Sequence, residues 1–198
     1  EGVIRSLLLS KKGEEVVGMG SEPIDLALSH ARRKYLVPYA NTNKYKDELV
    51  KVLRTVRPDL VHFQNDLEVF HASLLRDVIR EEGADVFMPD HKVIETCVDK
   101  WKSWNAFKKS GIVVPENIFI NDVSDLKLAF NELGNSEGEI WLRSDSIGGG
   151  GMGSIPTNDF NLAKAWIERS NGWGNFLAAE MLTSETVTWL SIWWKGEL

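Results

Sequence analysis

The chain of 198 residues carries 23 basic and 29 acidic side chains, so its formal net charge is −6. This balance argues against a nucleic-acid-binding scaffold, because proteins that bind phosphate backbones usually present a clustered basic face. The single cysteine, Cys97, excludes an intrachain disulfide and a cysteine-rich zinc site, and no apolar run is long enough to predict a membrane span. With 43% hydrophobic residues the composition is typical of a globular protein, for which we predict a cytoplasmic location.

The first half of the chain alternates helical and strand-like patterns. Apolar residues at helical spacing predict helices over 3–13, 43–57 (with Asn43 as cap and Pro58 beyond the end) and 67–83. Buried runs predict strands over 14–20, 34–40 and 84–90, and another within 59–66 that ends in polar residues. Strands that alternate with helices in this way form parallel sheets. We therefore predict a Rossmann-like domain over residues 1–92, in which ligands would lie beyond the carboxyl ends of the strands.

Two acidic residues lie at such a carboxyl end: Asp66 closes the stretch 59–66, and Glu68 follows it. They have two interpretations that the sequence leaves open. They could address a substrate amine or help to position a carboxylate, or they could begin a solvated helix with Asp66 as its cap.

The second half has a different order of elements. Helices are predicted over 91–111, 122–134 and 158–170, and strands over 112–120, 139–143, 175–182 and 185–194. Asp122 is the predicted cap of its helix, and Gly134 lies just past the end of that helix. Strands on both sides of a glycine-rich loop are typical of an antiparallel sheet. The prediction is an α+β domain over residues 93–198.

Five glycines occupy the six positions from Gly148 to Gly153, shortly after the strand that ends at Arg143. Glycine costs about 0.5–1 kcal/mol relative to alanine in regular structure, so the run needs a reason. One reason is a flexible hairpin tip. The other is a loop whose bare backbone N–H groups point at phosphate oxygens, with Arg143 as a charge-assisted partner. The run lacks the ending of a Walker-type loop and the spacing of a dinucleotide fingerprint.

Three stretches together resemble the ATP-grasp superfamily, most closely the proteins related to the large subunit of carbamoyl-phosphate synthase. The stretches are DKWKSWNAFKKSGIVVPEN (99–117), IWLRSDSIGGGGMG (140–153) and AAEMLTSETVTWLSIWWKGEL (178–198). The first half resembles the Rossmann-like domain that precedes the ATP-grasp domain in these enzymes. The resemblance implies that an opening strand lies before Glu1 and that the metal-binding strands lie after Leu198. We therefore expect the chain to be part of a longer protein.

The resemblance assigns the phosphates of ATP to two basic residues and one loop. Lys100 and Arg143 would contact the phosphates, and Arg143 is also the candidate catalytic residue. The loop would close over the phosphates with Gly148, Gly149, Gly150, Gly151, Met152 and Gly153. Only the resemblance distinguishes Lys100 from one more solvated lysine.

The resemblance also assigns the base and the ribose. Glu180 would open the hinge strand, and the backbone groups of Met181 and Leu182 would face the edge of the adenine. Glu185 would bind the ribose hydroxyls. Because the spacing in this chain is about one residue shorter than in the family, Thr186 is the alternative for that position.

The function that the resemblance implies is an ATP-dependent ligase that joins a carboxylate to an amine or ammonia through an acyl phosphate. ATP and Mg²⁺ would be the cofactors, and small-molecule carboxylates and amines the partners; no metal ligand is predicted within the chain. Two other classes remain open: a non-catalytic nucleotide-binding or regulatory module of the same fold, and an NAD-type oxidoreductase. The missing glycine fingerprint counts against the latter. The oligomeric state is open, with a homo-oligomer as one alternative.

Overall fold

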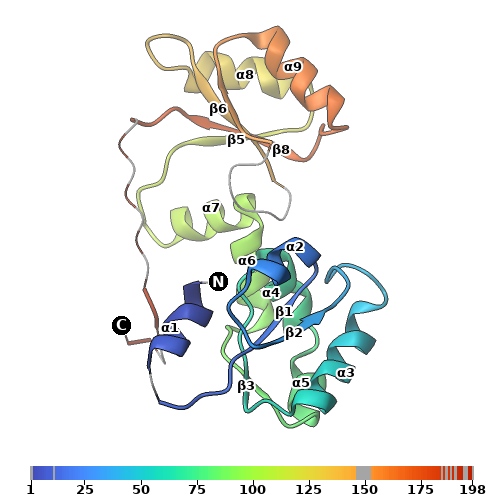
Figure 1. Cartoon of the computed structure of the whole chain (residues 1–198). Coiled ribbons are helices and arrows are strands. Elements are labelled where there is room, and N and C mark those ends of the chain that lie inside the picture. The colour runs from blue at the N-terminus through green and yellow to red at the C-terminus, as the bar shows by residue number, and fades with distance from the viewer. Residues whose placement is uncertain are drawn as a thin grey trace. The chain divides into compact units, whose positions relative to one another are not determined.

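The computed structural model describes residues 2–10, 12–145, 153–183, 185, 187, 189, 191–193, 196 and 197. These residues form two compact units, and the chain passes from the first to the second between Asp99 and Lys100 (Figure 1). No helix within the described ranges is long and apolar enough to cross a membrane.

The first unit alternates helices with short strands. Its elements are α1 (Gly2–Ser10), β1 (Val17–Gly20), α2 (Pro23–Leu28), β2 (Arg33–Leu36), α3 (Tyr45–Val56), β3 (Leu60–Val61), α4 (Asp66–Ser73), α5 (Arg76–Glu81), β4 (Asp85–Val86) and α6 (His91–Val98). Strand β1 pairs with β2 and β3 pairs with β4, both in parallel. The parallel pairing confirms the alternation that the sequence predicts.

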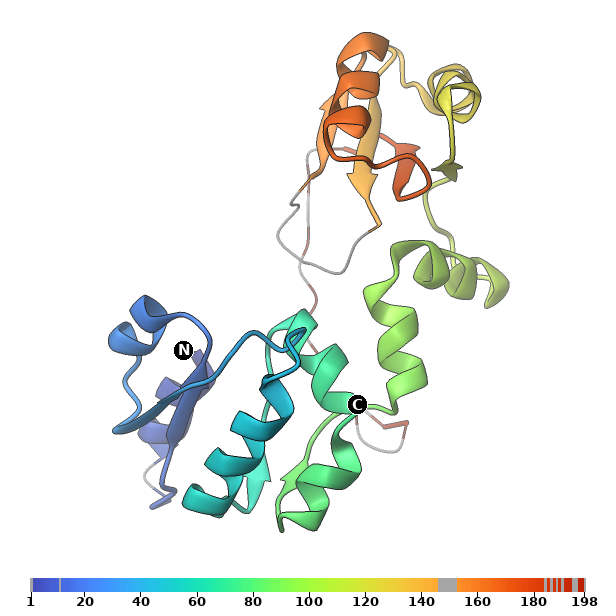
Figure 2. The same cartoon turned by 90° about the vertical axis from the view of Figure 1, so that its right-hand side faces the viewer.

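Helix α3 supplies much of the core of the first unit. Tyr45, Leu49 and Leu53 recur every four residues, so they share one face of the helix, and all three are buried. They belong to one cluster with Ile79 of α5, beside which α3 lies (Figure 2). The apolar face of α3 is therefore what holds it in the unit.

Two helix boundaries differ from the prediction. The helix expected over 67–83 is divided into α4 and α5, and its cap is Asn65 rather than Asp66. The Asn65 side chain accepts hydrogen bonds from the backbone N–H groups of Leu67 and Glu68 at 3.0 and 3.3 Å. At the division, the Ser73 hydroxyl donates to the Phe70 carbonyl at 2.6 Å. Side-chain bonds of this kind compete with the backbone ladder and bend helices.

A third boundary also differs. Asn43 is not the cap of α3, because Lys44 occupies that position with a helical backbone and without a capping side-chain bond. At the other end, α3 stops at Arg57, whose φ of 51° is left-handed. Pro58 follows at once, so the predicted end of this helix is correct within two residues.

The second unit is an antiparallel sheet with helices. Its elements are α7 (Lys100–Lys109), β5 (Asn117–Ile120), α8 (Val123–Leu133), β6 (Ile140–Ser144), β7 (Ile155–Thr157), α9 (Phe160–Arg169) and β8 (Phe176–Glu180). In the described residues the strand order is β5-β8-β6-β7, and every pair is antiparallel. The predicted α+β arrangement is confirmed. Asp122 caps α8 as predicted, accepting from the N–H groups of Ser124 and Asp125 at 2.7 and 3.2 Å.

Two strands of the second unit differ from the prediction. Strand β7 was not expected, because it is three residues long and contains Pro156. As β7 lies at an edge of the sheet, one side of it needs no ladder donor, and a proline is tolerated there. The strand expected over 185–194 lies partly outside the described residues. Residues 185, 187, 189 and 191–193, which are described, have no regular secondary structure.

The two faces of this sheet have different surroundings. Ile140 and Leu142 of β6 are fully buried in the core cluster that the sheet forms with α8 and α9 (Figure 1). Because successive side chains of a strand point to opposite faces, Trp141 and Arg143 lie on the other face. The alternation along β6 thus separates residues of the core from residues that are available to a site.

Candidate functional site

The sheet face opposite α8 and α9 carries two rows of side chains that run across the strands. The register places Arg143, Leu177 and Phe119 in one row, and Trp141, Ala179 and Asn117 in the next. Leu177 and Ala179 are buried, whereas Trp141 and Arg143 are half-buried. The indole of Trp141 and the guanidinium of Arg143 thus lie on the same face as the buried apolar side chains of Leu177 and Ala179.

Arg143 lies at the end of β6, and its side chain is half-buried. Its Nε is buried and has no hydrogen-bond partner among the described residues. Burial lowers the pKa of the guanidinium, and the negative charge of Asp145 acts in the opposite direction. Arginine remains protonated at neutral pH in either case. A buried donor without a partner costs about 1–3 kcal/mol, so the Nε position is energetically unfavourable as it stands.

The amino end of α7 lies beside the end of β6. The Oδ1 atom of Asp145 accepts hydrogen bonds from the backbone N–H groups of Lys100 and Trp101 at 2.8 and 3.2 Å. The backbone N–H of Asp145 donates to the Asn175 carbonyl at 2.8 Å. The structure therefore brings the backbone of Lys100 to the residue that stands two positions after Arg143. Asp145 was not among the predicted site residues.

Aromatic contacts hold α7 against the same face of the sheet. The ring of Trp101 lies 5.6 Å from that of Phe119, which belongs to the row of Arg143. Trp101 also stacks on Trp104, with ring centroids 4.9 Å apart and planes inclined by 15°. The first turn of α7 is consequently fixed by packing as well as by the hydrogen bonds to Asp145.

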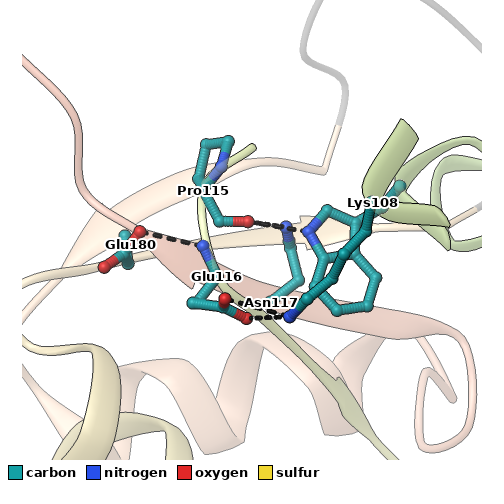
Figure 3. A network of polar contacts seen from close by, with 6 residues as sticks. Lys108, Pro115, Glu116, Asn117 and Glu180 are labelled. Atoms are coloured by element: carbon teal, nitrogen blue, oxygen red, sulfur yellow. Dashed lines mark hydrogen bonds and ion pairs between the residues drawn. The ribbon is translucent and has the colours of Figure 1, made fainter. Parts of the chain in front are cut away.

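The carboxyl half of α7 is tied to the start of β5 (Figure 3). Lys108 forms an ion pair with both carboxylate oxygens of Glu116, at 2.9 and 2.7 Å, and its Nζ lies 4.6 Å from the ring centre of Trp104. The Trp104 indole donates to the Pro115 carbonyl at 2.7 Å. Helix α7 is thus anchored to the sheet at both ends.

Glu180 closes the same network from β8. Its Oε2 accepts a hydrogen bond from the backbone N–H of Glu116 at 2.8 Å (Figure 3), and its own N–H donates to the Glu116 carbonyl at 3.1 Å. The Glu180 side chain therefore fastens the end of β8 to β5. Met181 and Leu182 follow without regular structure, half-buried and 62% exposed respectively. Glu185 is exposed, and the described contacts do not join it to the other candidates.

The glycine-rich loop is described only at its end. Gly148, Gly149, Gly150, Gly151 and Met152 lie outside the described residues, as does Thr186. Gly153 has a φ of +75°, which favours glycine, and its carbonyl accepts from the Trp166 indole at 3.1 Å. A Cβ atom on Gly153 would lie 3.4 Å from the Cβ of Ser144. Gly153 therefore lies beside Ser144 at the end of β6 and beside α9.

Glu68, one of the two acidic residues singled out in the first unit, contacts a buried tyrosine. Glu68 is half-buried in the first turn of α4, and its Oε1 accepts a hydrogen bond from the buried Tyr45 hydroxyl at 2.8 Å. Burial raises the pKa of the Glu68 carboxyl, and the hydrogen bond from Tyr45 lowers it in part. The hydrogen bond between Tyr45 and Glu68 gives the first unit a titratable contact between α3 and α4.

Substitution of Glu68 by glutamine is expected to remove a pH dependence of stability. Because the folded-state pKa of Glu68 is raised, its contribution is fully present below the unfolded pKa and is lost as the pH rises through the folded pKa. Glutamine keeps an acceptor for Tyr45 without the charge. The variant should exceed the wild type by on the order of 1 kcal/mol in the free energy of unfolding at pH 8, and the difference should vanish near pH 4.

Urea unfolding at both pH values measures this difference. Glu81, an exposed glutamate of α5, provides the matched control: Glu81→Gln should change the free energy of unfolding by less than about 0.5 kcal/mol. A gap between wild type and Glu68→Gln that is the same at pH 4 and pH 8 would show that the buried carboxyl does not titrate as described.

Known proteins are similar to this chain in fold. The sequence matches no protein-family model and no curated protein. The biotin carboxylase domain of 2-oxoglutarate carboxylase from Hydrogenobacter thermophilus has a TM-score of 0.63 at 20% identity, and the match covers 91% of this chain and 41% of that one. N5-carboxyaminoimidazole ribonucleotide synthetase from Thermus thermophilus has a TM-score of 0.64 at 14% identity, covering 90% and 43%. Carboxyaminoimidazole ribonucleotide synthase from Aspergillus clavatus has a TM-score of 0.63 at 14% identity, covering 91% and 44%.

The chain therefore has the fold of the amino-terminal part of ATP-grasp enzymes: a mixed α/β domain like the one that precedes the ATP-grasp domain, followed by an antiparallel sheet. It spans 41 to 44% of the length of the proteins named above. This likeness confirms the predicted fold class and the resemblance to the superfamily at the level of the fold. The closer resemblance to the large subunit of carbamoyl-phosphate synthase stays a prediction.

Proposed function

We propose that this chain forms the part of an ATP-dependent ligase that holds the phosphates and the base of ATP. The observation that carries the proposal is the guanidinium of Arg143, half-buried at the end of β6 with a buried Nε that lacks a partner among the described residues. The other N–H groups of the half-buried guanidinium would donate to phosphate oxygens, and their planar fork suits two oxygens at once.

The positive charge of the proposed site comes from side chains. Helix amino ends often bind phosphate through their free N–H groups. In α7 the first two of these groups, on Lys100 and Trp101, already donate to Asp145. Phosphate recognition would therefore rest on Arg143, on the Lys100 side chain and on the backbone of loop 148–153.

The base would lie further along the sheet. Trp141 stands between Arg143 and the end of β8 in the register, so its half-buried indole offers an apolar surface there. From Leu177, opposite Arg143, to Met181 the chain advances roughly 13 Å at the usual rise of a strand. The backbone of Met181 and Leu182 would face the adenine, and Glu185, or Thr186, the ribose.

The proposed reaction transfers the γ-phosphoryl group of ATP to a carboxylate, and an amine or ammonia then attacks the acyl carbon with loss of phosphate. Two of the similar structures support this chemistry: the Hydrogenobacter domain holds MgADP and bicarbonate, and the Aspergillus enzyme holds ATP. Arg143 would neutralise charge on the transferred group. We place the enzyme in the cytoplasm, with a homo-oligomer as its assembly by analogy with the Hydrogenobacter domain dimer.

The described residues do not define a ligand set for Mg²⁺. Among them, no three His, Cys, Asp or Glu side chains form a group that could hold a metal ion. Mg²⁺ ordinarily needs carboxylates together with the phosphates of its substrate. We therefore assign no step to Mg²⁺ through the described residues and place its protein ligands outside them.

Calorimetric titration of ATP, followed by a screen for ADP release against panels of carboxylates and amines, tests the proposal. We expect ATP to bind to this chain, and ADP to appear only when the protein in its full length receives a matching carboxylate and amine. Binding without ADP release from any pair would favour the non-catalytic nucleotide-binding module. Absence of ATP binding would contradict both forms of the proposal.

A further inference from the structure

We infer that Asp145 is a positioning residue of the nucleotide site, because its carboxylate joins the first turn of α7, which carries Lys100, to the end of β6, which carries Arg143. This inference rests on the proposed function and adds to it a residue that the sequence patterns did not select. Asp145 would hold the segments that carry Lys100 and Arg143 without itself contacting ATP.

The contacts of Asp145 run in three directions. Its Oδ1 accepts from the Lys100 and Trp101 N–H groups at 2.8 and 3.2 Å, which fixes the start of α7. Its own N–H donates to the Asn175 carbonyl at 2.8 Å, which fixes its backbone to the segment before β8. Its charge also acts on the guanidinium of Arg143. One residue therefore connects both cation-bearing segments.

The charge of Asp145 has to be reconciled with a site for phosphate. A carboxylate near phosphates would repel them if its charge were exposed to them. Here the charge faces two backbone N–H groups and the positive end of the α7 dipole, which offset it locally. The charge of Asp145 also acts on the guanidinium of Arg143 before ATP binds. Preorganisation of this kind lowers the cost of binding.

A plain helix cap is the alternative, and the chain contains a matched example. Asp122 accepts from the N–H groups of Ser124 and Asp125 at 2.7 and 3.2 Å at the start of α8. The buried residues of α8 belong to the core on the other face of the sheet. Asp122 thus makes the same kind of contact in the same unit, at a helix that packs on the face of the sheet opposite Arg143.

The test compares Asp145→Ala, Asp145→Asn and Asp122→Ala with the wild type by ATP titration and thermal unfolding. Asp145→Ala should weaken ATP binding about tenfold, because the start of α7 loses the two hydrogen bonds that hold it beside β6. Asparagine retains an oxygen that can accept both N–H groups, so Asp145→Asn should bind within about threefold of the wild type. Asp122→Ala should lower the melting temperature as Asp145→Ala does, with unchanged ATP affinity.

Several outcomes would overturn the inference. Wild-type affinity in Asp145→Ala would reduce Asp145 to a cap, and equal weakening in Asp122→Ala would show a general effect of capping. An Asp145→Asn protein as weak as Asp145→Ala would show that the hydrogen bonds to α7 do not position the site. If the alanine variant fails to fold, Asp145→Glu replaces it; it keeps the charge but displaces the oxygen, and wild-type affinity there would count against the inference. A wild type that binds no ATP removes the proposed function, and this inference with it.

Discussion

Replacement of Arg143 by alanine is expected to weaken ATP binding by roughly 10- to 100-fold. Hydrogen bonds between charged partners contribute about 1.5–3 kcal/mol, and each 1.4 kcal/mol corresponds to a factor of about ten in affinity. The free energy of unfolding should stay the same or rise slightly, because the substitution also removes a buried donor that has no partner among the described residues. Calorimetric titration with ATP and urea unfolding measure the two quantities separately.

Two further variants sharpen this prediction. Lysine at position 143 keeps the charge without the planar fork, so its affinity should fall between those of the wild type and alanine. Arg169, an exposed arginine of α9, is the matched control, and Arg169→Ala should leave ATP affinity unchanged. Equal ATP affinity in the wild type and Arg143→Ala would remove Arg143 from the site and with it the observation on which the proposed function depends.

Replacement of Leu142 by alanine should have the opposite profile. Leu142 precedes Arg143 in β6 but faces α8 and α9, where it is 0% exposed within the core cluster. Truncation of a buried leucine costs about 2–5 kcal/mol, since the lost burial is added to the cost of the cavity. We expect a large decrease in the free energy of unfolding of the second unit, measured by urea denaturation.

The comparison residue for Leu142 is Leu128 of α8, which is 47% exposed. Leu128→Ala should cost less than about 1 kcal/mol, because much of its side chain remains in water in the folded protein. Similar losses at both leucines would contradict the assignment of the two faces of the sheet. Together with Arg143→Ala, the two leucine variants test whether Leu142 supports folding while its neighbour Arg143 supports ATP binding.

The sequence predicted much of the fold because local patterns carry that information. The apolar spacing in α3, the cap Asp122 of α8 and the alternation along β6 each arise from residues within one element. Patterns of this kind indicate which face of an element will be buried. They also placed Arg143 at the end of a strand, where the structure has it one residue before the last.

The sequence-based predictions were wrong about the cap of α4, the division between α4 and α5, and strand β7. In each case the outcome depends on contacts that hydrophobic spacing does not record. Asn65 and Asp66 are both good caps, and only the backbone conformation shows that Asn65 accepts the hydrogen bonds. At the division between α4 and α5, a serine hydroxyl bonds to a carbonyl three residues earlier. Strand β7 is too short for a periodic pattern, and its existence depends on pairing with β6. None of these is visible in hydrophobic spacing.

By itself, the sequence determined the alternating first unit, the antiparallel second unit and the strand that ends beside a glycine-rich loop. Only the tertiary structure showed that Asp145 reaches the amino end of α7 across 45 positions of sequence, and that Trp141 and Arg143 share a face with Phe119 and Leu177. The physical reason is that periodicity records the polarity of each element alone. Contacts between distant elements depend on the strand order β5-β8-β6-β7 and its register, which many sequences with the same local pattern would not share.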